Sequence, residues 1–352
     1  MSRALILFRW ANVLLILLTL LAYLSPIISP VELWPFAFLG VLYPWLLFAN
    51  ILFVLFWLLQ GKWYLFLSLG CILLGWGHFR SFVGFHLPAE KREGVTLLRV
   101  MSFNCHGMRD REHWGEYLEA EELTRLMKGK DPDILCLQEF PSKIKQAQKY
   151  IDFLSSHSEL KYHYGEDGGL FIFSRYPLEN VTSKYFENGA NGYQVIDLTM
   201  EERALRVFNV HLQSNAVASL ADKVAEKGDI KERETWLNLK GMVNRYRRSA
   251  QERVWQTEEL LAVVDSSTVP VIVCGDFNDV PLSYIYNQLS SKLTDAFKIR
   301  GMGLGTTYDG NIPALRIDYI FVDPFFQVQE YETGRLSFSD HRPVRAALVL
   351  VK

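Results

Sequence analysis

The chain of 352 residues is poor in cysteine, with only Cys71, Cys105, Cys136 and Cys274. No two of them are separated by two residues, which excludes a zinc knuckle and a thioredoxin-like redox motif. Four cysteines are also too few for a disulfide framework in a chain of this length. Each lies in an apolar stretch, so we expect buried thiols that behave as small hydrophobic side chains.

Charge is scarce at the N-terminus, where residues 1–87 hold four basic residues and a single acid, Glu32. Long apolar stretches without a polar face are typical of helices that cross about 30 Å of hydrocarbon. Short polar breaks separate three such stretches, and tryptophans lie near their ends, as they do at lipid headgroups. The sequence therefore predicts a three-helix transmembrane region within residues 1–86, with spans at Leu5–Leu24, Leu33–Leu59 and Trp63–Phe79.

The few charges of this region predict its orientation. Arg3 and Arg9 mark the first end and Lys62 marks the second loop, whereas the loop with Glu32 has no basic residue. By the positive-inside rule, we expect a multi-pass protein of the plasma (inner) membrane with the domain after Phe79 on the extracytoplasmic side. A cleaved signal peptide is the alternative for the first stretch, but no small-residue cleavage site ends it.

The remainder of the chain is well charged. It holds 33 of the 37 basic and 38 of the 39 acidic residues, a formal charge of −5. This mildly acidic balance argues against tight non-specific binding to a nucleic acid backbone, which depends on Lys and Arg. The polar stretch 87–96 predicts a linker, so we expect residues 97–352 to form a separate catalytic domain.

Apolar stretches of strand length alternate with amphipathic helical stretches throughout this domain, which predicts a layered α/β fold. The predicted strands are Leu97–Phe103, Ile134–Gln138, Gly169–Phe173, Tyr193–Leu198, Leu205–His211, Val269–Cys274, Ile317–Phe321 and Val344–Leu350. The predicted helices are Glu112–Lys128, Ser142–Ser155, Asn215–Asp265 in one or two pieces, and Leu282–Leu289.

Side chains that bind metals or move protons recur where the predicted strands begin or end. Open α/β sheets place their sites at one such edge, so we expect the side chains of six separate segments to share a cleft. These residues are Asn104, Glu139, His211, Asp276, Asn278, Asp318, Asp340 and His341.

These residue types suit phosphate ester hydrolysis. The reaction needs a hard cation on the phosphoryl oxygens, an activated water and stabilisation of the leaving oxygen. Carboxylate oxygens such as those of Glu139 and Asp340 suit Mg²⁺ or Mn²⁺, and Mg²⁺ keeps several waters, so few protein ligands suffice.

Seven short motifs occur in an order that resembles the endonuclease/exonuclease/phosphatase superfamily, which includes deoxyribonuclease I. The resemblance covers about Leu97 to Lys352 and implies a four-layer α/β sandwich of the deoxyribonuclease I-like type. The motifs are Ser-Phe-Asn at 102–104, Leu-Gln-Glu at 137–139, Ile-Phe-Ser-Arg-Tyr-Pro at 172–177, Asn-Val-His-Leu at 209–212, Gly-Asp-Phe-Asn at 275–278, Arg-Ile-Asp-Tyr-Ile at 316–320 and Ser-Asp-His-Arg-Pro-Val at 339–344.

The resemblance implies a metal site for Mg²⁺ or Mn²⁺. Glu139 is expected to be the main ligand with Asn104 beside it. Asp340 is expected either to complete the ligand set or to hold a metal-bound water.

The resemblance also implies catalytic roles for five residues. Asp276 is expected to orient or deprotonate the attacking water, and Asn278 to hold a phosphoryl oxygen. His341, oriented by Asp318, and His211 are expected to act on the phosphate. Whether Asp276 or His341 is the general base stays open at this point.

Other polar residues near these motifs receive no site role. His106, His113, His157 and His163 are expected at the surface or in loops, and Asn209 is expected to support a strand end. Arg175 and Arg342 are expected either to brace loops or to contact the phosphate.

The substrate stays open between classes of phosphate ester. Three spans confine the site near a bilayer, which favours a phosphodiesterase or phosphatase acting on a phospholipid headgroup. A membrane-bound, magnesium-dependent endo- or exonuclease is the alternative, and a non-catalytic scaffold of the same fold is a third. We expect the substrate and the lipid bilayer as partners, and the sequence indicates no obligate protein partner.

Overall fold

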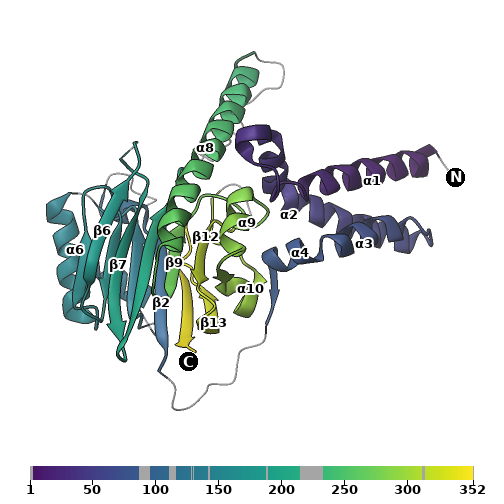
Figure 1. The fold of residues 1–352 in the computed structure, drawn as a ribbon. Coiled ribbons are helices and arrows are strands. Elements are labelled where there is room, and N and C mark those ends of the chain that lie inside the picture. The colour runs from purple at the N-terminus through teal and green to yellow at the C-terminus, as the bar shows by residue number, and fades with distance from the viewer. Residues whose placement is uncertain are drawn as a thin grey trace.

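The protein consists of apolar helices at the N-terminus followed by two packed β-sheets with helices on their outer faces (Figure 1). The structure, a computed structural model, describes residues 3–86, 96–110, 116–127, 129, 131–141, 143–187, 189–214, 233–310 and 314–351. The expected linker, 87–96, therefore lies almost wholly outside the described residues, and the boundary between the two regions stays a prediction.

Four helices form the N-terminal region: α1 (Arg3–Ala22), α2 (Pro30–Leu59), α3 (Leu65–Leu74) and α4 (Trp76–Phe82). The first two are long and apolar enough to cross a membrane. The third expected span corresponds to α3 and α4, which bend by 74° at a break between them. At that break a Cβ on Gly75 would overlap the ring of Tyr23, so the close approach of this ring requires glycine there.

Several uncharged polar side chains of these helices face one another rather than the outside. Asn12 of α1 donates to Ser68 of α3 (2.6 Å) and accepts from the indole of Trp57 in α2 (2.9 Å). Asn50 of α2 donates to Thr19 of α1 (2.9 Å). These hydrogen bonds satisfy polar groups between the helices, which leaves an apolar outer surface suited to lipid.

We call residues 97–352, which the sequence predicts to be the catalytic domain, the catalytic region, and its described residues form two six-stranded sheets. We call the sheet with strand order β13-β14-β2-β3-β5-β4 the first sheet and the sheet with order β10-β12-β9-β8-β7-β6 the second sheet. The strands of the first sheet are β2 (Leu98–Asn104), β3 (Ile134–Gln138), β4 (Tyr162–Gly165), β5 (Phe171–Ser174), β13 (Phe326–Thr333) and β14 (Val344–Leu350). Those of the second sheet are β6 (Glu179–Tyr185), β7 (Gly192–Met200), β8 (Arg203–His211), β9 (Val271–Asp276), β10 (Thr294–Asp295) and β12 (Asp318–Val322).

Alternation of apolar side chains along the strands gives each sheet two buried faces. Val100 and Ile272 point into the core between the two sheets. Phe103 points the other way, toward α6 (Ile144–His157), and Phe208 points toward α8 (Arg233–Asp265) and α9 (Tyr284–Ser290). The order helix, sheet, sheet, helix confirms the expected four-layer α/β sandwich.

Most elements agree with the sequence prediction, with differences at the surface. All eight predicted strands are present within a few residues, and all four cysteines are buried and free. The helix expected at Glu112–Lys128 is wrong in length, because only a 3₁₀ turn at Ala120–Glu122 and α5 (Leu123–Met127) form among its described residues. Of the helix expected at Asn215–Asp265, residues 215–232 lie outside the described residues.

The N-terminal helices pack directly on the catalytic region. A Cβ on Gly40 of α2 would overlap the carbonyl oxygen of Leu282, a few residues beyond β9. Arg316, just before β12, donates to the carbonyl oxygen of Ser81 in α4 (2.7 Å). Phe38 of α2 packs edge-on against Tyr246 of α8, with ring centroids 5.6 Å apart. A short ribbon of β1 (Val83–Phe85) and β11 (Met302–Leu304) adds a further contact.

Candidate active site

The strand directions bring the expected site residues to one edge of the two sheets. β2 and β3 are parallel, so Asn104 ends one strand beside the end of the other, where Glu139 follows. β8 and β9 are also parallel, and His211 is paired with Asp276 at their ends. β12 runs antiparallel to β9, which pairs its first residue, Asp318, with Asp276. The segment with Asp340 and His341 precedes β14, which is antiparallel to β2.

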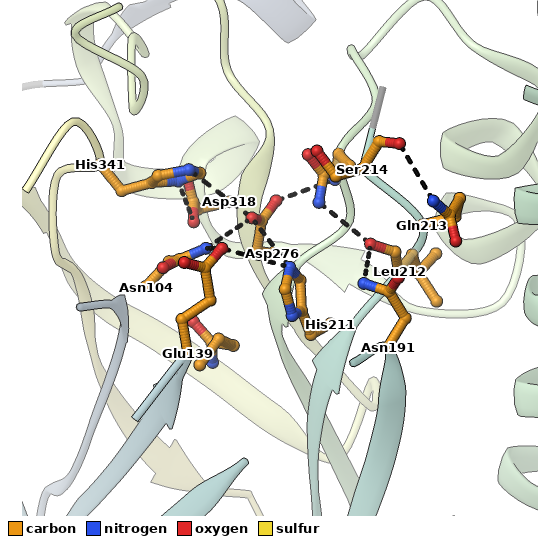
Figure 2. Close-up of polar contacts among 12 residues, drawn as sticks. Asn104, Glu139, Asn191, His211, Leu212, Gln213, Ser214, Asp276, Asp318 and His341 are labelled. Atoms are coloured by element: carbon orange, nitrogen blue, oxygen red, sulfur yellow. Dashed lines mark hydrogen bonds and ion pairs between the residues drawn. The ribbon is translucent and has the colours of Figure 1, made fainter. Parts of the chain in front are cut away.

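A hydrogen-bonded cluster forms at this edge, with side chains from both sheets directed at one another (Figure 2). Asn104 is fully buried, and its Nδ2 donates to Glu139 Oε1 (3.0 Å) and to Asp276 Oδ2 (3.0 Å). His211 Nε2 lies 3.8 Å from Glu139 Oε1 and 3.7 Å from Asp276 Oδ2. Asn104 therefore links the first sheet to the second across the base of the site.

His341 and Asp318 form a buried pair. His341 Nδ1 lies 3.1 Å and 3.0 Å from the two carboxylate oxygens of Asp318, and its Nε2 lies 3.7 Å from Asp276 Oδ2. Burial opposes a charge on His341, but the carboxylates of Asp318 and Asp276 outweigh this effect and raise the pKa of His341 above its ordinary value. The two carboxylates thus favour the protonated form of the imidazole, whose Nε2 faces Asp276.

The residues around this pair fix its position. Thr307 Oγ1 accepts hydrogen bonds from the backbone N–H groups of Ile317 (3.0 Å) and Asp318 (3.1 Å). The ring of Tyr308 packs edge-on against His341, with centroids 5.2 Å apart. Neither Thr307 nor Tyr308 was identified from the sequence, because they lie in an irregular segment outside the matched motifs.

Two of the site residues predicted from the sequence adopt a left-handed backbone conformation. Glu139 has a φ of 52° and Asn278 has a φ of 54°. This region is unfavourable for glutamate, and such conformations concentrate at functional sites, where the surrounding structure holds them. The turn after β3 thus directs the carboxylate of Glu139 toward the cluster, where the side chain stays 40% exposed.

Asn278 lies beside the cluster rather than at its centre. Its backbone N–H donates to Asp276 Oδ1 (2.9 Å), and its side-chain Nδ2 donates to the carbonyl oxygen of Leu212 (3.0 Å). Both contacts fix the chain immediately after β9.

His106 lies in a turn after β2, as expected of a loop residue, but its side chain borders the site, which was not predicted from the sequence. Its Nδ1 lies 3.8 Å from Glu139 Oε2 and 3.5 Å from Asp340 Oδ1, which joins Asp340 to the rest of the cluster. The signal in the sequence was its position two residues after Asn104. His157 and His163 are exposed as expected, and His113 lies outside the described residues.

The other polar residues whose roles were expected from the sequence make supporting contacts. Asn209 Nδ2 donates to the carbonyl oxygen of Leu137 (3.0 Å), which confirms its structural role between the sheets. Arg175 pairs with the buried Asp133 (3.0 Å), and Arg342 Nε donates to Asp309 (2.7 Å). Both arginines therefore brace neighbouring segments.

The oxygen and nitrogen atoms at the site are suitable ligands for a hydrated divalent cation. Asp340 Oδ1 and His211 Nε2 are buried and form no hydrogen bond with any described residue. Asp276, Asp318 and His341 also lie close enough together to hold an ion. However, both carboxylate oxygens of Asp318 already face His341 Nδ1. The side chains of Glu139 and Asp340, in contrast, are 40% and 22% exposed. The partly exposed carboxylates suit a cation that keeps some of its waters.

Comparisons with known proteins agree with this geometry. The model of the Endonuclease/Exonuclease/phosphatase family matches residues 101–341, and a domain of unknown function matches residues 4–82. No curated protein matches the chain at a significant level.

Solved structures share the fold of the catalytic region. An endonuclease/exonuclease/phosphatase from Bacteroides vulgatus is 18% identical with a TM-score of 0.50, over 72% of this chain and 99% of that one. A family protein from Leptotrichia buccalis is 14% identical with a TM-score of 0.50, over 71% and 99% of the two chains. A protein of unknown function from Enterococcus faecalis is 16% identical with a TM-score of 0.50, over 72% and 99%. With a family match over most of its length, the chain belongs to the endonuclease/exonuclease/phosphatase family.

Proposed function

We propose that this protein is a membrane-anchored, divalent-metal-dependent hydrolase that acts on a phosphate ester at the bilayer surface, in the first place a phospholipid headgroup. The observation that carries the proposal is the convergence of Asn104, Glu139, Asp276 and His341 from four separate strand ends on one cluster. Family membership supports the reaction class, and the apolar helices packed on the catalytic region support the location.

Glu139, Asp340 and Asn104 are the proposed residues for Mg²⁺ or Mn²⁺. The cation, when bound, neutralises charge on the phosphoryl oxygens. Glu139 and Asp340 supply the negative charge, and Asn104, through its hydrogen bond to Glu139 (3.0 Å), holds that carboxylate in place.

Asp276 is the proposed general base. Its Oδ1 accepts from the backbone N–H of Asn278 and its Oδ2 from Asn104, so the carboxylate is fixed in orientation. The carboxylates of Asp318 and Asp276 raise the pKa of His341, which favours the protonated imidazole, and a protonated imidazole donates rather than accepts. This difference favours Asp276 over His341 as the group that takes a proton from the attacking water.

The two histidines are proposed to contact the phosphate from different sides. His341 donates from Nε2 to a phosphoryl or leaving oxygen while Asp318 holds its Nδ1. His211, whose Nε2 has no hydrogen-bond partner among the described residues, offers the second imidazole. Asn278, fixed at the end of β9, is kept as a contact to a phosphoryl oxygen.

A substrate panel tests this proposal. The purified protein would be incubated with Mg²⁺ or Mn²⁺ and, in parallel, with phospholipid vesicles, inositol phosphates and DNA. Headgroup release from the vesicles, absent in a His341→Ala variant, is the expected result. Cleavage of DNA with intact phospholipid would instead establish the nuclease alternative.

A further inference from the structure

A cavity lies where α2 and α4 meet the catalytic region. Its volume is about 330 Å³, within the usual range of roughly 300–1,000 Å³ for small-molecule sites. Trp45 and Phe48 of α2 form one wall, Val83 at the start of β1 forms another, and residues 304–306 of the catalytic region close the third side. Nearly all of this lining is apolar, which excludes a polar solute as its ligand.

The mouth of this cavity is also apolar. Phe48 is 60% exposed and Leu304 is 64% exposed, although both line the cavity. The neighbouring ribbon of β1 and β11 exposes Phe85 (63%) and Met302 (64%) beside them. Because α2 is a candidate span, this exposed surface is continuous with the part of the protein that would face lipid. The cavity is therefore open to an apolar group from the bilayer.

Arg316 is the one charged residue among the described residues that line the cavity. It is 1% exposed, and its Nη2 donates to Asp295 (2.8 Å) and to the Ser81 carbonyl oxygen (2.7 Å). Its Nε and Nη1 form no hydrogen bond with any residue that the structure describes, and aromatic rings such as Phe297 cover its face. Because these nitrogen atoms are themselves buried beside the rings, Arg316 braces the wall of the cavity and offers no accessible donor to it.

We propose that this cavity binds one acyl chain of a membrane lipid. The apolar walls match the methylene chain, and the exposed apolar mouth matches entry from the bilayer. This binding site is separate from the proposed hydrolytic site, and it rests only on the anchoring of the helices in a bilayer.

Photo-crosslinking in a bilayer tests the site. The full-length protein would be reconstituted in phosphatidylcholine nanodiscs containing a phosphatidylcholine with a diazirine on its acyl chain, and labelled peptides would be mapped by mass spectrometry. We expect label on residues 304–306 and 314–316 of the catalytic region, besides the label on the exposed Leu52 and Leu55 of α2. Label on Leu52 and Leu55 reports anchoring, so its presence without label on the catalytic segments would overturn the cavity site alone.

A cavity-filling variant provides the specific test. Val83→Trp should lower the label on residues 304–306 roughly tenfold or more, equivalent to about 1.4 kcal/mol of binding, without changing the label on Leu52. Val31→Trp is the matched control, because Val31 is exposed on α2 outside the cavity. If Val83→Trp does not fold, Thr306→Trp fills the cavity from another lining position. Undiminished label in a folded cavity-filling variant would overturn the proposal.

None of these readouts depends on turnover, so failure of the hydrolase proposal would show separately.

Discussion

The Nδ1 atom of His341 lies 3.0 Å from Oδ2 of Asp318, in a pair that is almost completely buried. This contact leaves Nε2 as the atom of His341 that faces the proposed substrate position. The sequence alone does not reveal this contact, because the two residues belong to different motifs. They meet because β12 and the segment before β14 reach the same sheet edge.

Replacing Asp318 with asparagine tests this pair. Asp318→Asn keeps the shape of the side chain but removes the charge that favours protonated His341, so we expect turnover to fall by roughly 10²- to 10⁴-fold, the usual contribution of acid–base catalysis. The measurement is kcat and KM for bis-p-nitrophenyl phosphate. Asp152→Asn, in an exposed position on α6, is the control. A normal kcat for Asp318→Asn would show that the pair does not serve catalysis.

Glu139 is expected to dominate metal binding. Glu139→Gln removes a partly exposed carboxylate charge. Loss of a residue that merely orients a metal ligand weakens metal binding by roughly 10- to 100-fold, so loss of the ligand's own charge should weaken Mn²⁺ binding by at least this much. Isothermal titration with Mn²⁺ measures this directly. Glu258→Gln, on the exposed face of α8, should bind Mn²⁺ like the unaltered protein. Equal affinity in both variants would place the metal elsewhere.

The packing of α2 on the catalytic region depends on Gly40. A Cβ there would overlap the carbonyl oxygen of Leu282 and the hydroxyl of Ser25, so Gly40→Ala should lower the temperature of thermal unfolding. Gly70 in α3 has open space around it, and Gly70→Ala should raise stability by about 0.5–1 kcal/mol, as alanine does over glycine within a helix. Equal stability of the two variants in the same detergent would contradict the close contact.

The buried parts of the fold were predictable because they carry strong apolar patterns. β3 and β9 are buried at every residue, and their continuous apolar stretches were identified within two residues. β6 was missed because it is an edge strand with mostly exposed, polar residues, so its position is set by pairing with β7. The bend at Gly75 was missed for a related reason, since only contact with Tyr23 distinguishes this glycine from others in an apolar helix.

The site was predictable to the extent that its residues end buried strands. Asn104 and Asp276 are the last residues of β2 and β9, and the shared sheet edge follows from the strand directions. His106 was missed because its place depends on a turn in which it has a φ of 49°, and no local pattern specifies that turn. Backbone geometry beyond the strand ends is therefore the part that required the structure.

The orientation in the membrane is a separate prediction. The guanidinium of Arg9 lies 5.9 Å from the ring centroid of Tyr64, so the first basic end and the turn with Lys62 lie at the same end of the helices, far from the sheets (Figure 1). The positive-inside rule then places the catalytic region on the extracytoplasmic side. An alkaline phosphatase fused after Lys352 should be active and a green fluorescent protein fused there should be dark. The reverse pattern would overturn this orientation.

The central claim is that a divalent cation and the Glu139–His341 cluster together hydrolyse phosphate esters, and its most direct measurement is the metal-dependent turnover of bis-p-nitrophenyl phosphate. The purified protein should turn over this substrate with Mg²⁺ or Mn²⁺ and stop when EDTA is added. Glu139→Ala and His341→Ala should each lower the rate by orders of magnitude while the protein stays folded. Turnover that persists in EDTA, or that survives both substitutions, would contradict the claim.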